Sequence, residues 1–203
     1  MRVLVACEFS GVVREAFKKK GHEAWSCDLE PSEIKGNHIQ GDVLDVINDG
    51  WDLMIAHPPC TYLSNAGACR LYPTKGVLNK ERYKKGLQAK KFFVELLNAP
   101  IKKICVENPV SSTIFNMPKC SHEIQPYEFG HPYTKKTRLW LKGLPLLQPS
   151  NVVVPIGPYC PSGTGRKIKE KYGSAIRGND SKNRSITFQG IADAMAEQWG
   201  GEI

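Results

Sequence analysis

Two reactive side chains follow short apolar runs in the sequence. Cys60 comes shortly after residues 53–56 and directly after the pair Pro58-Pro59, and Glu107 follows residues 103–106. The prolines stiffen the chain before the thiol and remove two amide donors. A thiolate beside a carboxylic acid in a nucleotide-binding crevice suits covalent attack on an electron-poor ring. The alternative is that Cys60 is a buried turn thiol and that Glu107 pairs with a surface lysine.

Two aspartates occupy positions that suit recognition of a nucleoside. Asp28 lies just beyond residues 23–27, and Asp42 lies in the short segment 41–43. A carboxylate after the second strand of an α/β unit commonly accepts hydrogen bonds from ribose hydroxyls, and Asp42 could similarly hold an adenine amino group. Either aspartate can instead cap a helix or close a turn. The glycine signal for a nucleotide is weak, because Gly11 stands outside any G-x-G-x-x-G pattern.

The elements that must position these residues alternate between strands and helices. Apolar residues at helical spacing predict helices over 12–20 (with Gly21 as its C-terminal cap), 80–97 and 189–199. Short apolar runs predict strands over 2–7, 23–27, 53–56 and 103–106, a third short segment at 41–43, and an antiparallel pair, 127–130 with 137–141. Turn residues predict a turn at Phe9-Ser10-Gly11, a loop over 61–78, and a long, mobile, basic segment over 157–183.

This alternation predicts an α/β fold built on a doubly wound, mostly parallel sheet. Ligands bind such sheets in the crevice outside the carboxyl ends of the strands. The thiol, the carboxylates and the glycine turn all fall at predicted strand ends. That coincidence is the main reason, from the residues alone, to expect a binding site there.

Composition narrows the class of protein. The chain has 203 residues, a net charge of +8 and seven cysteines, which fits one domain, a polyanionic partner such as nucleic acid, and free thiols. No apolar run approaches the roughly 18–20 residues that cross a bilayer, so we expect a soluble, cytoplasmic protein without a membrane partner. No metal is expected, because Cys105, Cys120 and Cys160 with His122 or His131 match no familiar zinc spacing.

Six segments, in order along the chain, resemble the motifs of the DNA cytosine-5 methyltransferases. These motifs are the Phe-x-Gly turn, the ribose and adenine carboxylates, the nucleophile loop, Glu-Asn-Val, Gln-x-Arg-x-Arg, and the closing cofactor-binding motif. The matching segments are Phe9-Ser10-Gly11, Asp28 with Asp42, Pro58-Pro59-Cys60 followed by Tyr62-Leu63-Ser64, Glu107-Asn108, Thr134 to Arg138, and Gln189-Gly190. Six weak matches in the right order are together specific.

Five residues depart from the family pattern. Cys7 and Val13 stand where the first motif usually has an aspartate and a second glycine, and His57 replaces a residue that is commonly small. Thr134 and Lys136 replace the glutamine and the first arginine of the later motif. The departures concentrate around the cofactor, so the resemblance is closer for the nucleophile than for cofactor binding.

The resemblance implies a Rossmann-like, class I fold that uses S-adenosylmethionine and methylates C5 of cytosine in DNA. Cys60 would add to C6 of a flipped-out base. Glu107, protonated because burial raises its pKa, would donate to N3. Arg138 would hold the O2 atom of the base or a nearby phosphate. The residues implied to bind the cofactor are Phe9, Ser10, Gly11, Asp28, Asp42, Pro58, Gln189 and Gly190.

The resemblance also places the target-recognition region, as a small basic insertion over 144–184 in a single methyltransferase domain over 1–203. That length is short for reading several base pairs, so we expect a short or relaxed target sequence. Such an enzyme would suit a phage or mobile element, acting as a monomer in the cytoplasm of a bacterial or phage-infected host. The residues expected to contact DNA are Ser64, Lys136, Arg166, Lys167, Lys169, Arg177 and Arg184.

Three alternatives remain open from the sequence. The first is the same chemistry on RNA or on a free nucleotide such as dCMP, because the recognition region is small. The second is an amino-methyltransferase, whose motif of Asp or Asn, two prolines and an aromatic residue differs at both ends from His57-Pro58-Pro59-Cys60. The third is a catalytically inactive nucleic-acid-binding protein with the same fold, which the degraded first motif suggests.

Overall fold

A central sheet organises the fold in the computed structural model, which describes residues 1–159 and 184–201. Within those residues its seven strands lie in the order β3-β2-β1-β4-β5-β8-β6. Strands β3, β2, β1, β4 and β5 are mutually parallel, and β8 is antiparallel to both β5 and β6. The strands are β1 (Arg2–Ala6), β2 (Glu23–Asp28), β3 (His38–Gln40), β4 (Leu53–Ala56), β5 (Lys103–Pro109), β6 (His122–Ile124) and β8 (Thr137–Lys142).

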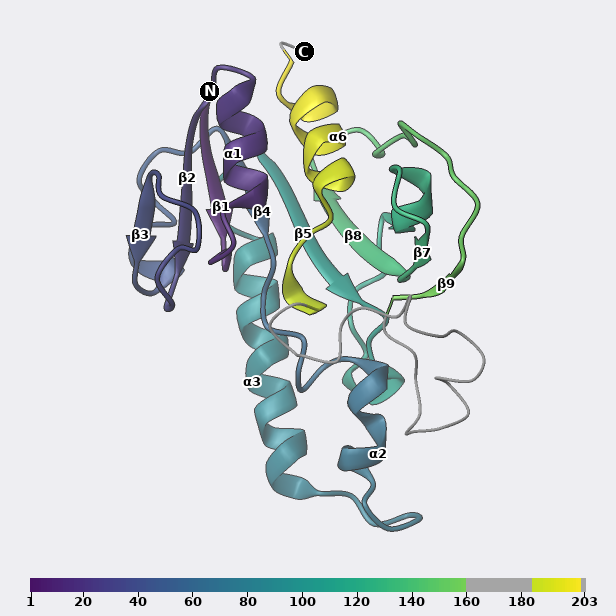
Figure 1. The fold of residues 1–203 in the computed structure, drawn as a ribbon. Helices are drawn as coiled ribbons and strands as arrows, with labels where there is room; N and C mark the ends of the chain where they lie inside the picture. Colours follow the sequence, from purple (N-terminus) through teal and green to yellow (C-terminus); the bar gives the residue numbers. More distant parts are fainter. Residues whose placement is uncertain (160–183, 202–203) are drawn as a thin grey trace.

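Helices cover both faces of this sheet (Figure 1). Helices α1 (Val12–Lys19) and α6 (Gln189–Trp199) pack side by side on one face, and α3 (Lys80–Leu97) covers the other. Because side chains alternate along a strand, each central strand contributes to both cores. Val3 and Val5 face α1 and α6, whereas Leu4 and Ala6 belong to the core under α3. The predicted α/β fold with a doubly wound, mostly parallel sheet is therefore confirmed.

Shorter elements complete the described chain. A two-stranded sheet pairs β7 (Tyr133–Thr134) with β9 (Gly157–Pro158). Helix α2 and four 3-10 turns lie in the connections: α2 (Ala68–Leu71), η1 (Val43–Asp45), η2 (Asn65–Gly67), η3 (Thr113–Phe115) and η4 (Pro126–Glu128). Within the described residues no helix is both long enough and apolar enough to cross a bilayer.

Several sequence-based boundaries are confirmed, and others are wrong. Helices α3 and α6 and strand β4 have the predicted bounds, and Gly21 follows α1 with a φ of +85°. The third strand lies at 38–40 instead of 41–43, because Asp42 caps η1. Residues 127–130 are not a strand, and β8 pairs with β5 and β6 instead. The predicted loop 61–78 contains η2 and α2.

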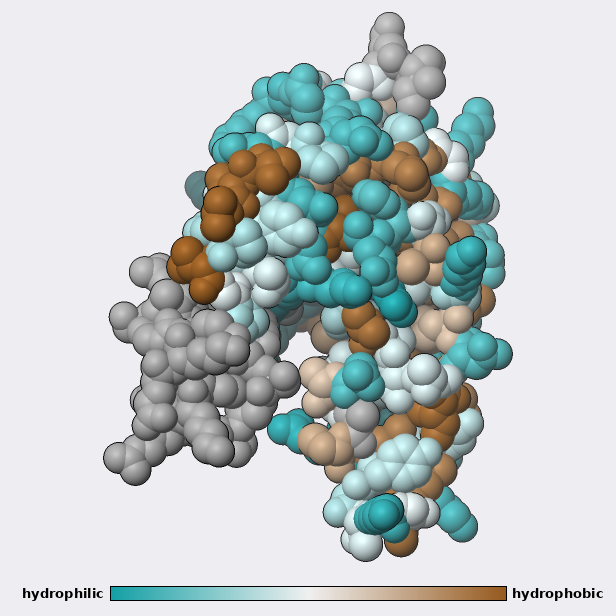
Figure 2. Space-filling model, turned by 90° about the vertical axis from the view of Figure 1, so that its right-hand side faces the viewer, coloured by the Kyte–Doolittle hydropathy of each residue, from teal (hydrophilic) through white to brown (hydrophobic). Residues whose placement is uncertain are grey.

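Part of the molecule projects beyond the carboxyl ends of the parallel strands. Figure 1 shows the first half of α3, with α2 beside it, extending past the sheet. Leu63, Leu71 and Phe115 form a small separate core there, and the rings of Tyr83 and Phe115 stack at 5.8 Å. The lower part of Figure 2 shows the same projection, which stands away from the main body of the molecule. The sheet edge is thus flanked by a wall on the α3 side.

Candidate active site

The nucleophile loop is held by backbone contacts on both sides of Cys60. The amides of Leu63 and Ser64 donate to the Cys60 carbonyl at 3.1 and 2.9 Å. The buried Asn108 donates through Nδ2 to the Pro58 carbonyl at 3.2 Å, which ties the loop to β5. The Cys60 thiol is half-buried at the carboxyl end of β4. The structure thus fixes the thiol at the edge that the sequence predicted.

Glu107 and His57 form a partly buried pair beside this loop. Ala56 of β4 is in register with Val106 of β5, so the residues that follow, His57 and Glu107, emerge next to each other. His57 Nδ1 lies 3.1 Å from Glu107 Oε2. The His57 side chain is 7% exposed, and its Nε2 is buried without a hydrogen-bond partner among the described residues. His57 was noted in the sequence only as a departure, and its contact with Glu107 depends on strand register.

The ionisation of Glu107 differs from the expectation. Burial by itself raises the pKa of Glu107, but the hydrogen bond and charge of His57, with the charge of Lys135, outweigh burial and leave the pKa below its ordinary value. The pKa of Glu107 is therefore shifted in the direction opposite to the one that donation of a proton to N3 requires. A carboxylate that shares a hydrogen bond with an imidazole is stabilised in its charged form.

The Cys60 thiol is held in its neutral form. Burial and the negative charge of Glu107 raise the pKa of Cys60, and the charges of Lys135 and Arg184 partly offset this rise. The thiolate is the nucleophilic form. The site therefore requires a change on substrate binding, or a proton acceptor, before Cys60 can attack.

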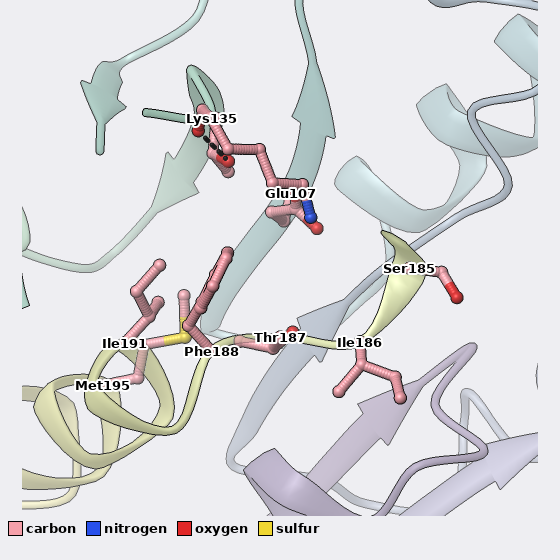
Figure 3. Close-up of a pocket in the computed structure, with 9 residues that line it drawn as sticks. Glu107, Lys135, Ser185, Ile186, Thr187, Phe188, Ile191 and Met195 are labelled. Carbon is pink, nitrogen blue, oxygen red and sulfur yellow. Dashed lines mark hydrogen bonds between the residues drawn. The ribbon is translucent and has the colours of Figure 1, made fainter. Parts of the chain in front are cut away.

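Lys135 is a site residue that the motif alignment passed over. Its ammonium donates to the Arg184 carbonyl at 2.7 Å and lies 5.5 Å from the Phe188 ring centroid. Figure 3 shows Lys135 and Glu107 pointing into one pocket. Apolar side chains at the start of α6 face them across this pocket, whose lining residues are Glu107, Lys135, Thr137, Ser185, Ile186, Thr187, Phe188, Ile191 and Met195.

The structure does not bring Arg138 to this pocket. Arg138 is paired with Asn108 in the β5–β8 register, and the next residue, Leu139, is opposite Glu107. Adjacent side chains on a strand point to opposite faces, so Arg138 lies on the α3 face. There Arg138 Nε donates to Glu123 at 2.7 Å, and Lys136 lies 3.3 Å from the same carboxylate. The predicted contact of Arg138 with the base is not supported by this arrangement.

The predicted cofactor turn is closed by an internal carboxylate. Gly11 has a φ of +75°, a conformation that suits glycine, and precedes α1. The buried Glu8 accepts hydrogen bonds from the Val13 amide at 2.7 Å, the Arg14 amide at 3.2 Å and the Ser10 hydroxyl at 3.3 Å. Glu8 therefore caps the helix in place of a side chain at Gly11.

A buried arginine holds the segment after β2 against the same turn. Arg14 is fully buried, and its guanidinium donates to the Ser26 hydroxyl at 2.8 Å, the Ser32 hydroxyl at 3.0 Å and the Ile34 carbonyl at 2.6 Å. The Phe9 carbonyl accepts the Glu33 amide at 2.8 Å. Neither Glu8 nor Arg14 was identified from the sequence, because charged residues in a turn or on a lysine-bearing helix are normally solvated.

The two predicted carboxylates lie at the same edge as this turn. Asp28 accepts the Glu30 amide at 2.9 Å, and Asp42 accepts the Leu44 amide at 3.0 Å as the cap of η1. Both charges, after burial as the larger cause, raise the pKa of the Cys7 thiol, which places all three groups close together. The turn-closing role is thus observed, and each carboxylate retains acceptor capacity for a ligand.

The start of α6 has a structural explanation of its own. The Gly190 amide donates to His131 Nε2 at 2.9 Å, and a Cβ at Gly190 would lie 1.9 Å from the Phe129 carbonyl oxygen. Glycine is required there for close packing of the helix. Gln189 donates to Asp193 at 2.8 Å within the helix. Cofactor binding by Gln189 and Gly190 stays a prediction.

The predicted DNA contacts are placed only in part. Ser64 lies in the nucleophile loop, and Arg184 lies beside Lys135. Leu147 is fully buried in the core under α1 and α6, so the beginning of the predicted recognition region packs on the main body. Lys136 pairs with Glu123 at 3.3 Å. The other four predicted residues lie outside the described part of the chain; they are Arg166, Lys167, Lys169 and Arg177.

Comparison with known proteins yields similarity at the level of structure only. No family model matches the sequence, and no curated protein sequence matches it. Similar solved structures include a prophage-encoded E. coli protein described as a DNA modification methyltransferase (15% identity, TM-score 0.47), the Entamoeba histolytica methyltransferase EhMeth (13%, 0.46), and a mutant of Spodoptera frugiperda DNMT2 (16%, 0.42).

These matches are partial in length. They cover 77%, 75% and 76% of this chain, in the same order, but 53%, 57% and 57% of the other chains. The chain therefore spans little more than half the length of the structures that it resembles. The function is argued from the site.

Proposed function

We propose that this chain is an S-adenosylmethionine-dependent methyltransferase that acts on C5 of cytosine in DNA through a covalent bond to Cys60. The observation that carries this proposal is the placement of Cys60 and Glu107 at the carboxyl ends of adjacent parallel strands, with His57 and Lys135 beside them. A nucleophile and an acid–base pair at one sheet edge are what addition to a pyrimidine ring requires.

Covalent addition gives cytosine C5 the electron density that it lacks. The Cys60 sulfur bonds to C6, the C5–C6 π electrons move toward N3, and a proton is delivered to N3. Bound S-adenosylmethionine would supply an electrophilic methyl group for C5, and its sulfur would leave as a neutral thioether. Loss of the C5 proton to a base, return of the N3 proton and breaking of the sulfur–C6 bond then regenerate Cys60. A base in duplex DNA must leave the stack to reach the thiol.

The pair of His57 and Glu107 supplies the proton for N3. Glu107 is a carboxylate in the unliganded protein and cannot donate. A protonated His57 can pass its Nδ1 proton to Glu107 Oε2 across the 3.1 Å contact, which leaves a neutral carboxylic acid that donates to N3. Neutralising Glu107 also removes one cause of the raised pKa of Cys60. Proton transfer from His57 to Glu107 and formation of the Cys60 thiolate therefore favour each other.

Lys135 takes the role that the motif resemblance implied for Arg138. It lines the same pocket as Glu107 (Figure 3), and its charge lowers the pKa of Cys60. An ammonium at this place would hold the O2 atom of the base and favour the thiolate. Arg138, on the opposite face, would instead keep β8 and β6 together through Glu123.

The described residues fit a nucleoside cofactor in their donor and acceptor chemistry. Asp28 and Asp42 converge near Cys7 at the end of β1, where carboxylate oxygens can accept bonds from ribose hydroxyls and an amino group. Phe9 and Gly11 would line the adenosine side of the same edge. The Glu8 carboxylate already uses the first amides of α1, so the cofactor would be held mainly by the aspartates.

A mechanism-based trap tests the proposal. We would incubate the protein and Cys60→Ala with S-adenosylmethionine and DNA that carries 5-fluorocytosine, because fluorine at C5 blocks the final elimination. The expected result is a methylated, denaturation-resistant adduct with the wild type and none with Cys60→Ala, with Cys69→Ala as the matched control that still reacts. Adducts only with RNA or dCMP would move the substrate class, and no adduct with any cytosine substrate would refute the proposal.

A further inference from the structure

A second pocket lies next to the nucleophile loop, on the projection formed by α2 and the first turns of α3 (Figure 1). Its walls are almost entirely polar and come from three separate segments of the chain. The lining residues are Tyr62, Arg70, Asn79, Glu81, Arg82 and Lys85. Three cations against one carboxylate give these walls a net charge of +2. The pocket is therefore chemically suited to an anion.

Arg82 is the fixed element of this pocket. Its Nη2 donates to the Thr61 carbonyl at 2.7 Å, and its guanidinium lies 5.0 Å from the centroid of the Tyr62 ring. The Arg82 amide donates to Asn79 Oδ1 at 3.0 Å, which sets the start of α3. A guanidinium has five N–H donors in one plane. The bond to Thr61 holds the group in place and leaves donors for a ligand.

Arg70 and Lys85 carry positive charges that other described residues neutralise weakly or not at all. Arg70 is exposed and has no ion pair or hydrogen bond to any described residue. Lys85 lies 2.9 Å from Glu81, but both side chains are well exposed, and surface pairs of this kind are weak. Lys85 can therefore exchange Glu81 for a stronger anion. The N-terminus of α3 adds its dipole in the same direction.

The pocket is built onto the nucleophile loop itself. Thr61 and Tyr62 follow Cys60 directly, and the Cys60 carbonyl closes the turn by accepting the Ser64 amide at 2.9 Å. We propose that Arg70, Arg82 and Lys85 bind the phosphate of the nucleotide whose cytosine reaches Cys60, an inference that rests on the proposed function. The phosphate can belong to a DNA backbone or to a mononucleotide such as dCMP, and the experiment separates these sources.

Binding is measured in Cys60→Ala protein, so that no chemistry contributes. The test variant is Arg70→Gln with Lys85→Gln, which leaves the structural Arg82 intact. The matched control is Lys84→Gln with Lys91→Gln, which removes two exposed cations of α3 that do not line the pocket. The probe is a labelled 20-mer duplex with one cytosine, titrated at several salt concentrations by fluorescence anisotropy.

The test variant should bind the duplex about 10–30-fold more weakly, and its salt slope should fall by about one. The control should weaken binding by about 2-fold with little change in slope. Equal losses in the two variants would overturn the proposal, because they would show a diffuse effect of charge. Glu81→Gln should act in the opposite direction and tighten binding about 3-fold, which a misfolded variant could not do.

A neutral methylphosphonate at one linkage beside the cytosine identifies the phosphate. It should lower the affinity of the parent protein to that of the test variant and cause no further loss in the variant itself; additive losses at both flanking linkages would overturn the assignment. In the mononucleotide arm, calorimetry compares dCMP with deoxycytidine. A preference for dCMP that the test variant loses, without any effect on DNA, assigns the pocket to a free nucleotide.

Failure of this proposal and failure of the proposed function give different results. If the 5-fluorocytosine adduct forms but substitution of Arg70 and Lys85 leaves the affinities for the duplex and for dCMP unchanged, the pocket is not a phosphate site and the cytosine chemistry stands. If no adduct forms while binding depends on the pair, the phosphate site stands on a protein without that chemistry.

Discussion

The carboxyl edge of the sheet has two halves, which differ in whether their polar groups face a pocket or bond to other parts of the chain. In the nucleophile half, made of His57, Cys60, Glu107 and Lys135, Glu107 and Lys135 line one pocket. Glu107 contacts His57, whose Nε2 is buried without a partner among the described residues. A buried polar atom without a partner is normally costly. That half is therefore arranged for a ligand that supplies the missing contacts.

The first-helix half, made of Glu8, Arg14, Asp28 and Asp42, uses its polar groups internally. Glu8 caps α1, Arg14 ties down the segment after β2, and each aspartate closes a turn. The first-motif departures from the cytosine-5 methyltransferase pattern lie in this half. Its internal hydrogen bonds hold the fold together and leave fewer free groups for a ligand.

The largest expected effect is in the nucleophile half. Glu107→Gln should lower methyl transfer by about 10³-fold, because the amide cannot deliver a proton to N3. The same change should accelerate alkylation of Cys60 by iodoacetamide at pH 8, because it removes a negative charge that raises the pKa of the thiol. Glu95→Gln on α3 is the control and should change neither rate. A slower alkylation in Glu107→Gln would contradict the assigned electrostatics.

The second prediction tests whether the first-helix half is structural. Arg14→Met should lower the free energy of unfolding by about 3 kcal/mol, because it removes the buried hydrogen bonds that the guanidinium donates to the Ser26 and Ser32 hydroxyls and the Ile34 carbonyl. Urea denaturation measures the loss, with the exposed Lys18→Met as control. The Cys60 alkylation rate should stay unchanged. A loss below about 1 kcal/mol would show that the network is not what holds this half.

The third prediction concerns the proton pair. His57→Phe should lower methyl transfer by about 30-fold and raise the pKa of Glu107, because it removes the partner that stabilises the carboxylate. Because the pKa of Glu107 is lower in the folded protein than in the unfolded chain, where it is near 4.5, ionised Glu107 stabilises the fold above that pH. The stabilisation is lost as the pH falls through the folded-state pKa.

The difference in unfolding free energy between wild type and His57→Phe should therefore be larger at pH 7 than at pH 3. Urea denaturation at the two pH values measures it. The change in ring size from imidazole to phenyl contributes equally at both, so the change with pH isolates the pair. A difference independent of pH would show that the contact with Glu107 adds nothing to stability.

The smallest effects are expected at the aspartates. Asp28→Asn and Asp42→Asn should each weaken S-adenosylmethionine binding by about 5–10-fold, because an amide is a poorer acceptor for hydroxyl and amino donors. Calorimetry measures the affinity, and Asp45→Asn, on the next turn, is the matched control. A loss of affinity of the same size in the control would show that the effect comes from overall charge and that Asp28 and Asp42 do not contact the cofactor.

The sequence alone determined the longer helices, the central parallel strands and the edge at which the reactive groups gather. Apolar runs of strand length and the 3.6-residue period of α3 and α6 require no tertiary information, so the bounds of β4, α3 and α6 were predicted as they are observed. Parallel strands place their carboxyl ends at one edge, and that rule suffices to bring Cys60 and Glu107 together.

Only the tertiary structure decided which face each residue of β8 occupies and how the acids ionise. Thr137 and Arg138 are adjacent in β8, so a period of two sends them to opposite sides of the sheet, and the β5–β8 register fixes which side; Lys135, just before β8, lines the same pocket as Thr137. Burial raises the pKa of Glu107, and the shift is reversed by Lys135 and by His57, which lies 50 residues away along the chain. Both outcomes depend on through-space neighbours, which local periodicity cannot specify.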